Sequence, residues 1–172
     1  MIKVFTDPLM IDYLQIATNL AADQRLHLEA MTGVPYDIDS AAVGNFISPG
    51  PKWVIKVGQD EQDFLLGKAR AIVVGGFNPT RPGVWRDFLL TTEDAFTKEF
   101  WFTVTRVCKR AMDSMFQSGM AHRLECVVPA ARLESRPELA DWYKLLGYNK
   151  EGLHHGYCAS GADAVSFARV KH

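Results

Sequence analysis

The sequence has little cysteine and no pattern that would tie its cysteines together. Cys108, Cys126 and Cys158 are odd in number and far apart, and none belongs to a Cys-x-x-Cys pair. We therefore expect no disulfide framework and no structural zinc site, but three buried, reduced thiols. Histidine does not supply a metal site either, because the adjacent His154 and His155 would face opposite sides of a strand.

The sequence also lacks an excess of charge and a long hydrophobic run. Lys and Arg number 19 against 20 Asp and Glu, a formal net charge of −1. That balance offers no basic field for phosphates, so we expect no nucleic acid partner. Every long window is broken by charged residues, Gly or Pro, and the first residues do not resemble a signal peptide, so we expect no membrane span. These absences favour a soluble, cytoplasmic protein, in agreement with reduced cysteines.

What the chain does have is enough apolar sequence for one core. Its 172 residues are 48% apolar, and we expect a single domain over residues 1–172. The hydrophobic patterns predict strands over 1–6, 53–57, 69–77, 84–91, 123–128, 153–158 and 164–170, and helices over 7–20, 22–31, 39–47, 97–118 and 135–147. This order is mixed α/β, with helix crossovers that require some parallel pairing and hairpins that do not.

Local signals fix several expected helix ends. Asp7 followed by Pro8 is typical of a helix start, since Asp accepts the first amides and Pro lacks one. Ser135 with Glu138 predicts a capping box. Gly119 and Gly147 should close the helices that precede them, Gly147 as a left-handed cap.

The order of elements resembles the GNAT acetyltransferase superfamily over nearly the whole chain. The residues that carry the resemblance open the fifth strand, as Arg-Leu-Glu at 123–125, and follow the last helix. The family's Tyr-x-x-x-Gly-aromatic string and its later Glu-Gly pair are matched by Tyr143, Gly147, Tyr148, Glu151 and Gly152. The resemblance implies one GNAT-like α/β domain, with flanking helices around a mixed, mostly antiparallel sheet of about seven strands.

In that family acetyl-CoA lies between splayed fourth and fifth strands. Its pyrophosphate rests on backbone amides at the start of the long helix, where the dipole favours anions. The resemblance therefore implies a cofactor site at Leu89, Leu90 and Thr91, continuing to Thr97 and Lys98.

The sequence departs from the family at this point. The expected glycine-rich phosphate loop falls near residues 97–104, which read Thr-Lys-Glu-Phe-Trp-Phe-Thr-Val and contain no glycine. Glycine lets a backbone approach a phosphate closely, whereas the aromatic side chains here would obstruct it. Negative charge comes from Glu93, Asp94 and Glu99, and only Lys98 favours a phosphate. This departure argues against acetyl-CoA as a bound cofactor.

Acetyl transfer needs a base for the amine and an acid for the departing thiolate. The resemblance makes Tyr143 the acid, and the alternative is a core-facing aromatic on an amphipathic helix. Candidate bases are Asp87 and Glu93, with Glu125 as a third, although such a residue is more often a solvated surface carboxylate. Asp87 shares a strand face with apolar residues, which would raise its pKa.

A narrower resemblance concerns the Leu-Leu-Thr-Thr strand at 89–92, the acidic turn, the Phe-Trp-Phe at 100–102, and Trp142. These features are similar to acetyltransferase-like proteins of short-tailed phages, one of which is needed to assemble internal virion components. Two functions follow. The first is a protein in the host cytoplasm or the virion that acts through protein contacts. The second is an active N-acetyltransferase for a small amine or a protein amine. The sequence leaves open whether the chain forms a homo-oligomer.

Overall fold

A computed structural model describes residues 1–171, apart from the side chain of Glu99. Its seven strands are β1 (Ile2–Phe5), β2 (Lys52–Val57), β3 (Arg70–Arg81), β4 (Val84–Thr91), β5 (Arg123–Pro129), β6 (Asn149–His154) and β7 (Ala164–Val170). They form one sheet with the hydrogen-bonded order β1-β2-β3-β4-β5-β7-β6. Strands β4 and β5 pair in parallel, while β1–β2, β2–β3, β5–β7 and β6–β7 pair antiparallel. The expected mixed, mostly antiparallel α/β fold is confirmed.

The helices are α1 (Met10–Thr18), α2 (Ala22–Thr32), α3 (Ile38–Ile47), α4 (Glu61–Leu65), α5 (Lys98–Gln117), α6 (Ala130–Ser135) and α7 (Glu138–Leu145), with a 3₁₀ turn, η1 (Glu93–Phe96). The chain divides into two compact units. The first contains residues 1–21, 37–78 and 88–104, and the second contains residues 22–36, 79–87 and 105–172. A single domain over the whole chain stays a prediction, and each unit is described by itself.

In the first unit, a buried carboxylate ties α1 to the sheet. Asp12 is 2% exposed and pairs with Lys56 of β2 at 2.6 Å. Its other oxygen accepts the amide of Leu9 at 2.9 Å, so α1 begins at Met10. The predicted start at Asp7 and Pro8 is therefore wrong, because the acid that satisfies the first amides comes from inside the helix.

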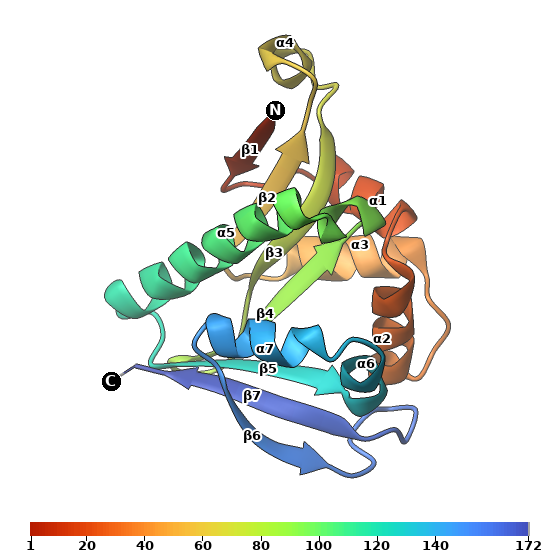
Figure 1. The fold of residues 1–172 in the computed structure, drawn as a ribbon, viewed down its shortest axis with the longest axis vertical. Coiled ribbons are helices and arrows are strands. Elements are labelled where there is room, and N and C mark those ends of the chain that lie inside the picture. The colour runs from red at the N-terminus through yellow and green to blue at the C-terminus, as the bar shows by residue number, and fades with distance from the viewer. Residues whose placement is uncertain (172) are drawn as a thin grey trace. The chain divides into compact units, whose positions relative to one another are not determined.

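The second unit is built on β5, which pairs with β7, and β7 in turn with β6 (Figure 1). Helix α7 packs on this sheet through Tyr143, whose ring stacks on Phe167 of β7 at 4.8 Å between centroids. Helix α6 is joined to α2 by Arg132, which donates to Asp23 at 3.0 Å. These contacts place α7 beside the strands that carry the candidate site.

Two other expectations about the second unit are wrong. Ser135 ends α6 and donates to the carbonyl of Arg132 at 3.1 Å, so it does not cap α7, which begins at Glu138. Strand β6 begins at Asn149, four residues before its predicted start, because Gly147, with φ of 91°, turns the chain directly from helix to strand. The left-handed glycine itself was predicted correctly.

The three cysteines are free and buried, as expected. No helix within residues 1–171 is both long and apolar enough to cross a membrane. Within the same residues, no three His, Cys, Asp or Glu side chains gather where they could hold a metal ion.

The packing of β2 on β3 can be tested at glycine. A Cβ added to Gly75 would lie 2.4 Å from the buried ring of Trp53, whereas one added to Gly44 of α3 meets nothing within 4 Å. We expect Gly75→Ala to lower the free energy of unfolding by about 1–3 kcal/mol through overpacking. Gly44→Ala should raise it by about 0.5–1 kcal/mol. Denaturant titration of both variants checks this, and equal stabilities would contradict the described packing.

Candidate functional site

The candidate site begins where the parallel pairing of β4 with β5 ends. That pairing joins only the first three residues of each strand, from Val84 with Arg123 to Arg86 with Glu125. The next residues are Asp87 and Cys126, one on each strand.

Four side chains of the second unit lie close together and are here called the Asp87 cluster: Asp87, Cys126, Tyr143 and Tyr148. The hydroxyl of Tyr148 donates to Asp87 Oδ2 at 2.9 Å. Cys126 and Tyr143 are buried beside this pair, close enough that the charge of Asp87 raises the pKa of both.

Burial governs the protonation of the Asp87 cluster. It raises the pKa of Asp87 to about 6, although hydrogen bonds from Tyr148 and Cys126 act in the opposite direction. Burial also raises the pKa of Tyr143, Tyr148 and Cys126 well above their ordinary values, and the nearby Asp87 adds to each shift. Near neutral pH only Asp87 can gain or lose a proton, so the cluster has one titrating member.

Tyr143, the acid implied by the resemblance, lies in the core. It is 7% exposed, stacks on Phe167, and meets Tyr148 edge to face with centroids 6.1 Å apart. The preceding Trp142 donates from Nε1 to Thr105 of α5 at 2.9 Å. Ring contacts with Trp142, Tyr148 and Phe167 therefore hold Tyr143 inside the second unit.

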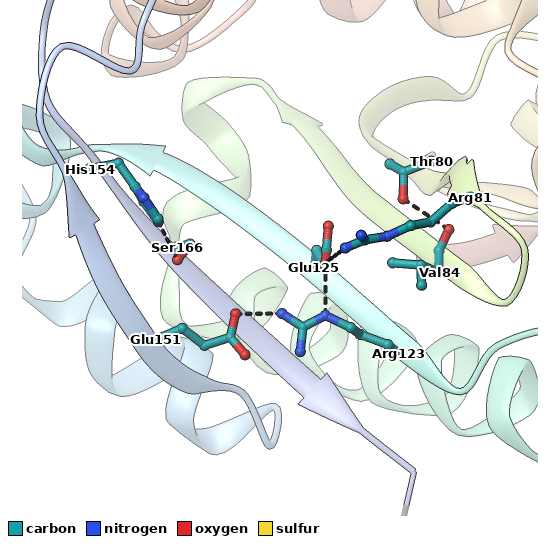
Figure 2. A network of polar contacts seen from close by, with 8 residues as sticks. All are labelled: Thr80, Arg81, Val84, Arg123, Glu125, Glu151, His154 and Ser166. Atoms are coloured by element: carbon teal, nitrogen blue, oxygen red, sulfur yellow. Dashed lines mark hydrogen bonds and ion pairs between the residues drawn. The ribbon is translucent and has the colours of Figure 1, made fainter.

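The other two candidate bases lie elsewhere. Glu93 is an exposed residue of η1 in the first unit and is not a member of the Asp87 cluster. Glu125 belongs to a charged network on β5 (Figure 2), in which Arg123 donates to it at 2.7 Å and Arg81 at 3.2 Å. Burial acts to raise the pKa of Glu125, but the two arginines outweigh burial and hold it below its ordinary value. A carboxylate so stabilised in its charged form is a weak base.

The rest of the network in Figure 2 is also occupied within the protein. Arg123 pairs with Glu151 as well as with Glu125. His154 and Ser166 share a hydrogen bond of 2.8 Å across β6 and β7. Three charged residues of the motifs that carried the family resemblance, Arg123, Glu125 and Glu151, thus belong to one ion-pair network.

The residues expected to hold a cofactor are partly in the core and partly exposed. Leu90 and Thr91 are buried at the end of β4, Leu89 is partly buried, and Thr97 and Lys98 are exposed at the start of α5. The Thr91 carbonyl accepts the amide of Ala21 at 3.0 Å. The amide of Thr92 donates to the carbonyl of Ile72 at 2.9 Å. These backbone groups after β4 are therefore used by the fold.

An aromatic pair lies beside the first turn of α5. The ring of Trp101 stacks on that of Phe96, with centroids 5.4 Å apart and planes 30° from parallel. Lys98 is the first residue of the helix, and Asp94, before it, pairs with Arg70 at 2.5 Å. The side chain of Glu99, also expected to oppose a phosphate, lies outside the described residues.

Sequence reasoning missed Cys126 and Tyr148 as partners of Asp87. The strand period places Cys126 on the buried face of β5, between Leu124 and Val128, but three buried residues in alternation read simply as core. Tyr148 was noted only as the aromatic that follows Gly147. The hydrogen bonds that join these side chains to Asp87 depend on tertiary packing.

Comparisons with known proteins show the fold. No family model matches the chain, and no curated protein matches it. Among solved structures, it is similar to a GNAT-family acetyltransferase from Bacillus anthracis, with a TM-score of 0.67 and 8% identity over 98% of this chain and 94% of that one. A ribosomal-protein-S5-alanine acetyltransferase from Vibrio fischeri has a TM-score of 0.62 and 15% identity over 98% and 92%. A spermidine N-acetyltransferase chimera from Vibrio cholerae and hSSAT has a TM-score of 0.65 and 13% identity, over 98% of this chain and 95% of that one. The chain has the GNAT acetyltransferase fold.

The raised pKa of Asp87 predicts a pH-dependent stability. A carboxyl whose pKa is higher in the folded state contributes stability at low pH and loses it as pH rises through the folded value, about 6. Asp87→Asn carries a neutral group at every pH and does not lose this stability. The free energy of unfolding of Asp87→Asn should therefore rise relative to that of the wild type by up to about 3 kcal/mol between about pH 4 and pH 8. Urea titrations across this range measure the difference.

Tyr148→Phe provides the matched comparison. It removes a donor that lowers the pKa of Asp87, so the loss of stability should extend to higher pH than in wild type. Identical pH dependence in wild type and Asp87→Asn would show that Asp87 is not the titrating group.

Proposed function

We propose that this chain is a GNAT-fold protein that has lost the pyrophosphate site for acetyl-CoA and acts through contacts with other proteins. Its setting would be the assembly or the interior of a phage virion, made in the host cytoplasm. The observation that carries the proposal is the start of α5, where Phe96 and Trp101 stack on each other and no glycine occurs.

A pyrophosphate needs close backbone approach and positive charge at a helix start. Residues 97–104 offer no glycine for that approach. The cation at this place is Lys98, while Arg70 of the same unit is paired with Asp94. The residues present therefore do not fit the phosphates of acetyl-CoA.

The state of Tyr143 supports the same conclusion. An acid for a departing thiolate must present its proton to the sulfur, but Tyr143 is buried and its ring stacks on Phe167. Burial raises its pKa further above the range in which a phenol gives up a proton readily. In this reading Tyr143 is a core residue of α7.

The virion setting rests on the similarity of residues 89–102 and Trp142 to the acetyltransferase-like proteins of short-tailed phages. Such a protein would work without a cofactor, through the surfaces that contact its partners. A homo-oligomer is compatible with this role.

A second function is favoured by one observation, the Asp87 cluster. A carboxyl group with a pKa of about 6, hydrogen-bonded to Tyr148, is the type of shifted group that occurs at catalytic sites. In this alternative the chain is an N-acetyltransferase for a small amine or a protein amine. Similarity to a spermidine acetyltransferase and a ribosomal-protein acetyltransferase supports the alternative equally well.

Binding of acetyl-CoA separates the two functions. A ligand that binds only the folded state at about 100 times its Kd stabilises it by about 2.7 kcal/mol, a shift of several degrees in Tm. We expect no such shift for the wild-type protein at about 1 mM acetyl-CoA, by calorimetry or dye-monitored melting.

The matched variant is Tyr143→Phe. An upward shift in Tm with acetyl-CoA, together with acetyl transfer to spermidine that Tyr143→Phe abolishes, would contradict the proposal and establish the enzyme. A shift that persists in Tyr143→Phe without any transfer would show a retained CoA site, which also contradicts the loss of that site.

A further inference from the structure

We propose that the exposed apolar face of α3 is a docking surface for a basic amphipathic helix of another protein. This inference rests on the proposed function, since it names the kind of partner through which the chain would act. The surface is called the α3 stripe and consists of Val43, Phe46 and Ile47.

The α3 stripe is apolar and open. Its residues are spaced three and four apart, so they lie on one face of the helix. Val43 is 42% exposed, Phe46 36% and Ile47 69%. An apolar face that a monomer leaves uncovered marks an interaction site when its residues adjoin one another.

The helix that carries the stripe is held in place within the first unit. The ring of Phe46 meets the buried Tyr13 of α1 edge to face, with centroids 5.7 Å apart. Asp37 caps the helix by accepting the amide of Ser40 at 2.8 Å. Since Phe46 of the stripe is itself held by Tyr13 and the helix start is capped, a partner would find the stripe already formed.

The charge around the stripe selects the partner. Within the first unit, residues 37–51 contain Asp37 and Asp39 but no Lys or Arg. Asp39 lies one turn before Val43, on the same face of α3. The next cation, Lys52, donates to the carbonyl of Ser48 and so is engaged locally. A surface of apolar residues with an acidic border is complementary to a helix with apolar residues on one side and Lys or Arg beside them.

The same charges count against two other occupants. A second copy of α3 would offer Asp37 and Asp39 no Lys or Arg, because residues 37–51 contain none, so that interface would lack charge complementarity. An anionic lipid surface attracts basic helices and would repel this one.

A synthetic helix tests the proposal without knowledge of the natural partner. The probe is a fluorescein-labelled peptide of Leu and Lys, about four turns long, with Leu on one face. The control peptide has Glu in place of every Lys. We expect the Lys peptide to bind the whole protein in an anisotropy titration, and the Glu peptide not to bind.

Matched variants locate the binding. Ile47→Gln should weaken the Lys peptide by about tenfold or more, because it removes an apolar contact at the open face. Leu65→Gln changes an apolar residue of α4 that is 79% exposed and should leave the affinity unchanged. Asp39→Asn should weaken binding and reduce its dependence on salt.

Several results would overturn the α3 stripe as the site. They are absence of binding, equal affinity for Ile47→Gln and wild type, and equal binding of both peptides. Sedimentation velocity that shows a dimer dissolved by Ile47→Gln would assign the stripe to a second copy instead. Because acetyl-CoA binding is measured separately, a failed peptide test with no Tm shift leaves the proposed function standing. Conversely, a Tm shift overturns that function whatever the peptide does.

Discussion

Strand β5 accepts β4 in parallel for three residues and then continues without that pairing, and the second unit is organised by this limit. Parallel neighbours must be joined by a crossover, which is why α5 lies between these strands in the chain. Where the pairing ends, Asp87 and Cys126 interact through their side chains. Tyr143 and Tyr148, at the end of α7 and just after it, complete the group. The Asp87 cluster therefore results from a strand pair that is cut short.

A carboxyl group in this place is costly to the folded state at neutral pH, since burial raises its pKa to about 6. Such a cost is common at sites that perform chemistry. In this chain, however, Asp87 is hydrogen-bonded to the buried Tyr148, and the helix start at which a pyrophosphate was expected holds an aromatic pair. The Asp87 cluster thus contains a carboxyl group with a raised pKa, while the start of α5 has no glycine for a phosphate to approach. Because the second observation counts against a bound cofactor, we prefer protein contacts as the proposed function.

The sequence predicted the order of elements well, but some ends and partners poorly. Strands 84–91 and 164–170 and the long helix were located within about a residue or two, because their hydrophobic periods are unambiguous. The start of α1 was misplaced because Asp12, held by Lys56, supplies the cap that Asp7 was expected to give. Helix α6 was missed, and with it the true role of Ser135, because six residues between a strand and a helix carry no clear period. Of the candidate site, Asp87 and Tyr143 were named, but not Tyr148 as the donor to Asp87 or Cys126 as their buried neighbour.

By itself, the sequence determined the α/β class, the sheet of about seven strands and the absence of glycine at the start of the long helix. These depend on composition and on periods within single segments, which local sequence specifies. Only the tertiary structure decided that Asp87 meets Cys126 and Tyr148, that Glu125 is paired with two arginines, and that the α3 stripe is left uncovered. Hydrogen bonds, ion pairs and burial between distant segments depend on how the elements pack, and no window of sequence contains that information.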